Sequence, residues 1–379
     1  MGSVNRLANL TGVPTGGAAM NILTYRVVDT GPRTYTVTDD SYRLLGGLKG
    51  SWNGWKWDSA ALYSKARTKD MTHNAISNTL FQQALNRTDA SAYNPFNGGN
   101  LDNYSLGDTS PNSRDTINAF LINVYRISET SLALADFKVS KKDLFRLPGG
   151  DVGVASGVEV RRETQLDDRD KRIDGTITFT DPISGTVLSD LINSSLNPDT
   201  KGHRSVASTY IEFAVPLVSP ELNIPLVHRL DLQLAGRYEH YSDFGDVAKP
   251  KVALAWDLVD GVRVRGSYSK GFRAPNLLQV NSAIVTRGNT RTDYIFCEAD
   301  LRAGRISTFS ACSASIVATA QRAGNPDLKA ETSESQSIGL VLQPKFIPSE
   351  LGRFTLTVDV WDTKQNGIIG VFGEGKIGR

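Results

Sequence analysis

The segment 229–241 reads RLDLQLAGRYEHY, and apolar and polar residues alternate along it. One side of the extended chain carries Leu230, Leu232, Leu234 and Tyr238, and the other carries Asp231, Gln233, Ala235, Arg237 and Glu239. A period of two residues is typical of a β-strand, because successive side chains point to opposite faces of a sheet. The segments 204–218, 251–258, 261–271 and 354–364 alternate in the same way. The sequence therefore predicts an all-β, antiparallel fold of about eleven strands.

The lengths of the connections between these strands distinguish two kinds of sheet. Short connections are expected at 53–54, 148–150, 218–227, 259–261 and 347–352, and they alternate with long ones at about 70–129, 166–203 and 271–333. The brief connection 242–247 is the exception. A soluble sandwich has no reason to collect its long loops at one end, whereas an outer-membrane barrel has short periplasmic turns and long extracellular loops. We therefore expect a transmembrane β-barrel.

Two stretches of the first long loop have apolar residues three and four positions apart, which predicts short helices at 75–87 and 113–127. Strands are the alternative reading for both. Aromatic residues near strand ends, namely Trp52, Trp55, Trp57, Tyr238 and Tyr241, indicate the two interfacial girdles of a barrel, although cross-strand packing in a soluble sheet would also explain them.

Composition excludes several other classes of protein. The 42 basic and 40 acidic residues nearly balance, so the sequence gives no reason to expect nucleic-acid binding. No apolar run is long enough for a transmembrane helix. The first residues, MGSVNRLANLTGVPTGG, contain no signal peptide, and we expect them to follow from truncation of a longer exported protein.

The sequence has two cysteines, Cys297 and Cys312, separated by 15 positions. No further cysteine or histidine lies beside them to complete a zinc site, so no metal site and no cofactor are predicted. A disulfide is the favoured interpretation, with two free thiols as the alternative. A disulfide would imply an oxidising compartment.

Several segments resemble one known family. They are NPFNGG (94–99), LFRLPGGDVGVASGVEVRRE (144–163), VPLVSPEL (215–222), RGSYSKGFRAPNLLQV (265–280) and GNPDLKAETSES (324–335). In this order they resemble the TonB-dependent outer-membrane receptors, and the last two are the most specific. Ala330 stands where the family usually has proline.

The resemblance implies a receptor that imports a bulky nutrient, such as a ferric siderophore, corrinoid, haem or oligosaccharide, energised by a TonB protein. It also implies a barrel of roughly 22 strands in contact with outer-membrane lipid. No segment before Arg43 resembles the family's plug domain or TonB-contacting box. Residues 1–379 are therefore expected to be a central part of a barrel domain, which on its own neither inserts nor transports.

Two groups of residues are candidates for ligand binding. Exposed loops are expected to carry Asn94, Phe96, Tyr104, Tyr294 and Phe296, whose side chains would contact a ligand or pack within their own loops. Inward-facing arginines are expected at Arg161, Arg237, Arg263, Arg265 and Arg273. These would bind an anionic ligand or, as we favour, pair with carboxylates such as Glu159, Glu212 and Glu239.

An enzyme is disfavoured by the motifs. The segment GSYSKG is not a Gly-x-Ser-x-Gly nucleophile elbow, and GGLKGSW lacks the Lys-Ser ending of a phosphate-binding loop. A passive porin is the closer alternative, but the Phe-Arg-Ala-Pro and Gly-Asn-Pro motifs count against it.

Overall fold

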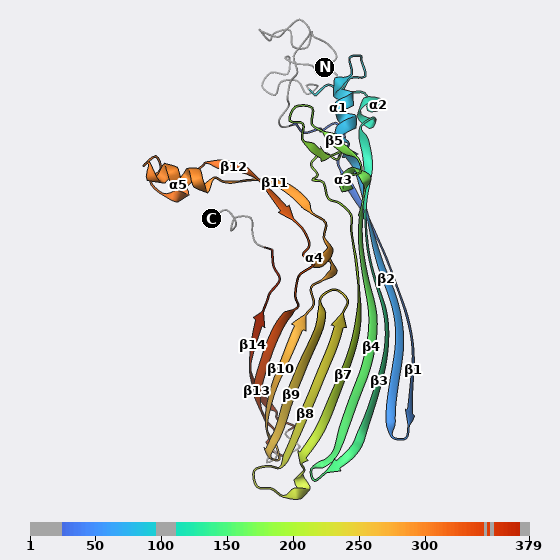
Figure 1. Cartoon of the computed structure of the whole chain (residues 1–379), viewed down its shortest axis with the longest axis vertical. Coiled ribbons are helices and arrows are strands. Elements are labelled where there is room, and N and C mark those ends of the chain that lie inside the picture. Colours follow the sequence, from blue (N-terminus) through green and yellow to red (C-terminus); the bar gives the residue numbers. More distant parts are fainter. Residues whose placement is uncertain (1–24, 96–110, 345–346, 349–351, 372–379) are drawn as a thin grey trace.

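The computed structural model describes residues 25–95, 111–344, 347–348 and 352–371. Ten long antiparallel strands form one curved sheet, and loops with short helices extend from one end of it (Figure 1). The strand order is β1-β2-β3-β4-β7-β8-β9-β10-β13-β14. Each strand of this sheet therefore pairs with the strand of the sheet that comes before or after it in sequence. Within the described residues β1 and β14 are the two edges. The predicted antiparallel barrel-type sheet is confirmed, with ten strands in it against the expected eleven.

The strands are long enough to cross a membrane. They are β1 (Thr34–Trp52), β2 (Trp55–Ile76), β3 (Leu121–Leu147), β4 (Gly150–Arg169), β7 (Thr200–Val218), β8 (Arg229–Tyr241), β9 (Gly245–Val259), β10 (Val262–Arg273), β13 (Glu331–Leu342) and β14 (Leu356–Asn366). None of the helices in the described part of the chain is long and apolar enough to span a membrane.

Tight turns close the lower end of the sheet in Figure 1. Asn53 and Gly54 both have positive φ, of 49° and 82°, as a two-residue hairpin turn requires. Gly150 and Gly261 likewise have positive φ at the β3–β4 and β9–β10 turns. The long connections all leave the other end, so the predicted alternation of short and long connections is confirmed.

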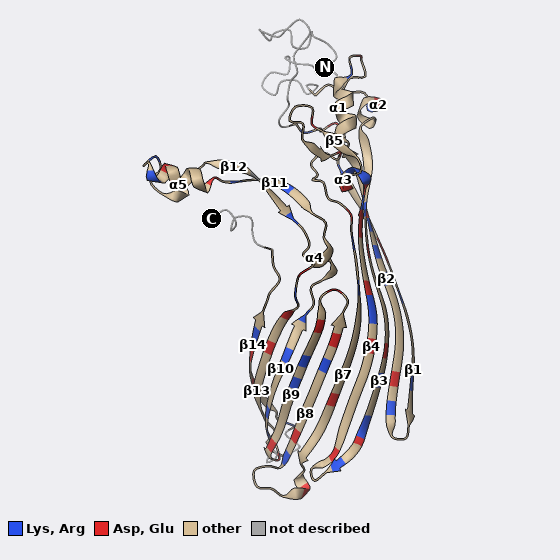
Figure 2. Ribbon diagram, viewed as in Figure 1, with Lys and Arg blue, Asp and Glu red and all other residues tan. Residues whose placement is uncertain are grey.

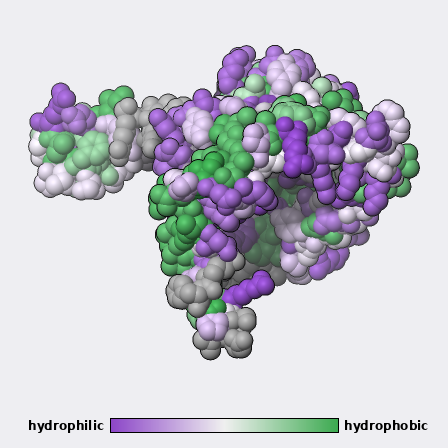
Figure 3. All heavy atoms as spheres, turned by 90° about the horizontal axis from the view of Figure 1, so that it is seen from below, coloured by the Kyte–Doolittle hydropathy of each residue, from purple (hydrophilic) through white to green (hydrophobic). Residues whose placement is uncertain are grey.

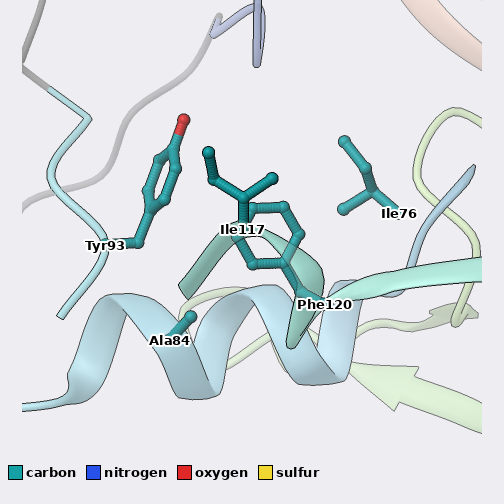
Figure 4. Packing of buried hydrophobic residues seen from close by; sticks show 5 residues of the cluster. All are labelled: Ile76, Ala84, Tyr93, Ile117 and Phe120. Atoms are coloured by element: carbon teal, nitrogen blue, oxygen red, sulfur yellow. The ribbon is translucent and has the colours of Figure 1, made fainter. Parts of the chain in front are cut away.

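The first long loop, between β2 and β3, has a hydrophobic core of its own. It contains α1 (Asn78–Asn86) and α2 (Arg114–Asn118), capped by Ser77 and Ser113. The buried side chains of this core are Ile76, Ala84, Tyr93, Ile117 and Phe120 (Figure 4). The helix expected at 75–87 is confirmed.

The helix expected at 113–127 is wrong beyond its first turns. α2 ends at Asn118, and Leu121 begins β3, whose residues pair with β2. Leu121 and Val124 therefore lie on a strand, where a spacing of three residues does not place side chains on one face. Pairing with the neighbouring strand outweighed the local apolar spacing.

Two small hairpins and three further short helices lie in the other long loops. They are β5 (Thr178–Thr180) with β6 (Val187–Ser189), β11 (Val285–Thr292) with β12 (Ser315–Arg322), α3 (Lys171–Asp174), α4 (Leu277–Asn281) and α5 (Tyr294–Arg302). In the described part of the chain, two single 3-10 turns occur at Pro220–Leu222 and Phe309–Ala311. The β11–β12 hairpin projects as an arm with α5 at its tip (Figure 1), and a disulfide joins Cys297 and Cys312 there.

The two faces of the large sheet differ in polarity. Apolar side chains such as Val158, Val160 and Ile211 are exposed on the convex face. The alternate positions carry charged residues on the concave face, and from below the surface is seen to be hollowed (Figure 3). This is the distribution of a barrel with lipid outside and water inside. Tyr241 is 4% exposed and contacts Glu239 on the concave face, so its assignment to an interfacial girdle is wrong.

Candidate functional site

The pairing register places the five predicted arginines on one face of the sheet, the concave one. Charged residues occur along most of the long strands (Figure 2). Arg161 on β4 binds Glu159 at 2.8 Å and Glu163 at 2.9 Å. Its guanidinium also lies 3.0 Å from the hydroxyl of Tyr241, two strands away on β8. Only the concave side of a curved sheet brings such side chains together.

The other four arginines are also paired with carboxylates. Arg263 binds Asp257, Arg265 binds Asp359 and Arg273 binds Glu331, each through two guanidinium nitrogens. Arg237 binds Glu239. Glu212 instead accepts a hydrogen bond from Gln233 at 2.5 Å. Two-point arginine–carboxylate pairs are geometrically specific. The pairs of Arg263 and Arg273 link adjacent strands, and that of Arg265 reaches across β13 to β14.

Arg204 is a concave-face cation that the sequence pattern did not reveal. Its side chain is 3% exposed and lies 3.0 Å from Asp243 and 2.5 Å from the carbonyl oxygen of Pro275. The guanidinium also lies over the rings of Tyr241 and Phe244. Its register partner is Glu163, and only knowledge of the β4–β7 pairing would have identified it.

The two most specific sequence motifs contact each other. Arg273 pairs with Glu331 across β10 and β13, and the amide of Gly324 donates to the carbonyl of Ser282 at 2.9 Å. The amide of Asn325 donates to Gln279 in α4 at 2.8 Å. A Cβ atom on Gly324 would lie 2.5 Å from the Ser282 nitrogen, which explains why this position is occupied by glycine. The motif pair is therefore one structural unit at the upper rim of the sheet.

An open cavity of about 760 Å³ lies beside this unit. The charged residues lining it are Arg237, Glu239, Lys249, Lys251, Lys270 and Arg273. Within the described residues, no carboxylate lies at ion-pair distance from Lys249 or Lys251. A second hollow of about 880 Å³ lies lower on the sheet, lined by Arg229, Gln233, Arg265, Asp359 and Trp361 among others. The upper cavity carries excess positive charge and suits an anionic group.

The loop candidates do not form one site. Asn94 is 8% exposed and is held by Asn112, whose side chain bonds both its amide and its carbonyl group. Tyr294 stacks on Phe309, and Phe296 is 53% exposed on α5. α5 lies at the tip of the arm, apart from the first loop (Figure 1). Phe96 and Tyr104 lie outside the described residues.

Asp190 holds two of the long loops together. Its carboxylate is fully buried and accepts hydrogen bonds from the Ser77 hydroxyl at 2.7 Å and the Thr79 amide at 2.8 Å. It also pairs with Arg172. Burial favours the neutral acid, but the hydrogen bonds from Thr79, Ser77 and Arg172 outweigh it and lower the pKa of Asp190.

The family model described as "TonB dependent receptor-like, beta-barrel" matches residues 15–378, which is almost the whole chain. The chain belongs to the TonB-dependent receptor family. Proteins of this family are outer-membrane transport receptors rather than enzymes, as the sequence motifs predicted.

Among related TonB-dependent receptors, the chain is 26% identical over 184 residues to the probable TonB-dependent siderophore receptor PirA of Acinetobacter baumannii. That alignment covers 46% of this chain and 20% of the relative. The crystal structure of PirA gives a TM-score of 0.47 at 18% identity, over 87% of this chain and 35% of that one. A mutant of the ferric enterobactin receptor PfeA from Pseudomonas aeruginosa gives 0.44 at 16% identity, over 88% and 35%. The chain thus spans about a third or less of these relatives.

Proposed function

We propose that residues 1–379 form one part of the barrel domain of an outer-membrane receptor for TonB-energised uptake of a ferric siderophore. The family match supports the transport class. A plug domain and a TonB-contacting box would belong to the complete receptor. The ten-stranded sheet with two edges in its described part supports a larger barrel, because lipid does not tolerate unpaired strand edges.

We infer the chemical class of the ligand from the upper concave cavity. Within the described residues, Lys249 and Lys251 line it with no carboxylate at ion-pair distance, whereas the lining residues Arg237 and Arg273 are paired with Glu239 and Glu331. Ferric siderophores are commonly anionic, and charged groups lining a cleft raise the local concentration of oppositely charged ligands. The curated relative is itself named a probable siderophore receptor. An uncharged oligosaccharide would depend less on the two lysines.

The transport proposal is tested by deleting the gene and measuring uptake of radiolabelled ferric siderophores in iron-starved cells. Uptake should fall on deletion and should also be lost when TonB is inactivated. Uptake that depends on the gene but continues without TonB would support the passive porin instead. Uptake unchanged by deletion would reject both assignments.

The ligand class is tested with the double variant Lys249→Gln/Lys251→Gln in the receptor as the cell makes it. We expect binding of an anionic ferric siderophore to weaken about fivefold or more, and to become less dependent on salt. The matched control, Lys65→Gln/Arg162→Gln, removes two charges from the convex face, because Arg162 lies on the same face of β4 as Val160 and the register places Lys65 on that face of β2. It should bind the siderophore normally. Equal affinity of wild type and the lysine variant would rule out an anionic ligand at this cavity.

A further inference from the structure

The arm formed by β11 and β12 stands apart from the large sheet. Its two strands pair with each other from Val285–Arg322 to Thr292–Ser315, and within the described residues neither strand pairs with a third one. The arm extends sideways beyond the outline of the large sheet in both views (Figure 1 and Figure 3). An isolated two-stranded hairpin is marginally stable in water, and its outer edges offer unpaired backbone groups to a further strand.

The two outer edges of the arm differ in their protection against pairing. The edge of β11 carries Arg287, Gly288 and Arg291. Charged side chains discourage the addition of a strand to an edge, and glycine weakens a strand. From Ser315 to Gln321 the edge of β12 reads SIVATAQ, without charge, glycine or proline. A short, uncharged segment of this composition pairs readily with other strands. The edge available for pairing is therefore that of β12.

Apolar side chains on both faces of β12 are open to solvent. Ile316 is 52% and Val317 73% exposed. Because these residues are consecutive in a strand, their side chains point to opposite faces of the arm. Packing against one face of the arm would cover only one of them. A strand added at the edge places neighbours about 4.5–5.5 Å away on both faces and would therefore contact both side chains.

A second copy of β12 is complementary to this edge. An antiparallel register can place Ser315 opposite Gln321 of the second copy. Val317 of each copy then lies opposite Thr319 of the other, which gives two β-branched pairs on one face. None of the opposed residues is charged. The register is also its own two-fold mate, so both copies make the same contacts, as a symmetric dimer requires.

A membrane favours a second receptor over a soluble peptide as the occupant of the edge. Receptors in one outer membrane share one orientation, so their arms lie at the same height and need only approach sideways. One strand pair is a small interface, below the ~1,200–2,000 Å² of a stable complex, and two partners free in solution would therefore associate weakly. Confinement to one plane raises the local concentration of the arms, as a linker does for tethered partners.

We propose that β12 is the contact between two neighbouring receptors in the outer membrane. Their arms join edge to edge into one four-stranded antiparallel sheet, in the order β11-β12-β12-β11. The inference goes beyond nutrient uptake and does not depend on which nutrient is carried. It rests on the outer-membrane location of the receptor.

The test is cysteine cross-linking of the receptor in native outer membranes, read on a denaturing gel. In paired arms the two thiols of Thr319→Cys would lie about 8 Å apart, one strand spacing and two residues from each other. The matched control is Thr290→Cys, on the same face of β11. Its two thiols would lie about 16 Å apart, beyond the reach of a bismaleimide that spans ~8 Å. We expect at least about fivefold more dimer from Thr319→Cys.

A second comparison, made in the Thr319→Cys receptor, tests the edge itself. Val317→Lys adds a charge at the contact and should remove most of the dimer. Thr290→Lys adds the same charge directly opposite Val317 on β11, away from the contact, and should leave the dimer unchanged. Labelling with a monofunctional maleimide checks that the Thr319→Cys and Thr290→Cys thiols react equally.

Three results would overturn the proposal. Equal amounts of dimer from Thr319→Cys and Thr290→Cys would mean that chance collisions produce it. Absence of dimer from a reactive Thr319→Cys receptor would show that no second copy lies at this edge. Dimer that survives Val317→Lys, or that is lost equally with Thr290→Lys, would show that the contact is not made by β12.

Discussion

Asp190 is a buried carboxylate whose hydrogen-bond donors come from two different long loops. Ser77 and Thr79 lie at the start of α1, and Arg172 lies in α3. Replacement by asparagine keeps the shape but removes the charge that satisfies Arg172. Hydrogen bonds to charged groups contribute about 1.5–3 kcal/mol each, so Asp190→Asn should destabilise the packed loops by about 2 kcal/mol or more.

Hydrogen exchange of the α1 amides measures this loss. At neutral pH the variant should exchange faster than wild type, and the exposed control Asp327→Asn should not. The folded pKa of Asp190 is lowered, so its stabilisation is complete above the unfolded value of about 3.9 and is lost as pH falls through the folded pKa. After correction for intrinsic exchange rates, the difference should therefore shrink below about pH 4. A difference that persists there would contradict the assignment.

Gly324 is the residue at which the two family motifs touch. An added methyl group would lie 2.5 Å from the Ser282 nitrogen and 2.6 Å from the Val280 oxygen, both of which are backbone atoms. Gly324→Ala should therefore separate the 324–331 segment from α4 and speed its cleavage by added protease. The control Gly236→Ala meets no atom within 4 Å and should be cleaved like wild type. Equal cleavage of both variants would show that the close approach has no mechanical role.

At the scale of the strand, neighbouring residues of β9 meet different solvents. Val252 is 42% exposed on the convex face, whereas Ala253 lines the lower concave hollow. An arginine facing lipid costs about 2–4 kcal/mol near the bilayer midplane, but one facing water costs little. Val252→Arg should reduce the folded fraction recovered in outer membranes much more than Ala253→Arg, measured by heat-modifiable gel mobility. A reversed order would mean that the faces are assigned the wrong way round.

Strand position, turn length and loop polarity were predictable because each depends on residues close in sequence. Val252 and Ala253 show this, since period-two alternation alone separates their faces. The residues from Leu121 to Ile127 were assigned to a helix because apolar spacing cannot register the β2 partner that makes them a strand. For the same reason Tyr241 was wrongly assigned to an interfacial girdle, and Arg204 was not identified. Their surroundings are created by β4, β7 and loop residues far away in the sequence.

At the scale of the whole molecule, the sheet has an edge strand on each side in its described part. β1 pairs only with β2, and β14 only with β13, so two rows of backbone groups face outward. Unpaired edges are not tolerated in hydrocarbon and promote association in water. We expect residues 1–379 expressed alone to aggregate rather than insert as a monomer. Protease protection in liposomes measures this, and a protected, heat-modifiable monomer would show that the sheet closes on itself.

The five arginines could be placed on one face from the sequence, and so could the partners Glu159 and Glu239 of Arg161 and Arg237. The partners of Arg263, Arg265 and Arg273 could not. Asp359, the partner of Arg265, is 94 positions away. The basic excess at the cavity appears only when Lys249 and Lys251 are seen beside Arg273. The sequence pattern thus identified the face that carries the candidate site, and the sheet register determined which charges remain available to a ligand.

The cystine at the tip of the arm bears on how the receptor is assembled. Cys297 and Cys312 are the two cysteines of the sequence and are 15 positions apart, so this chain allows only one intramolecular pairing. Closing so short a loop does not require the sheet to have formed. Oxidation of this pair can therefore finish while the strands are still unpaired. The arm would then be covalently closed before the strands pair, and its disulfide would not depend on the success of barrel closure.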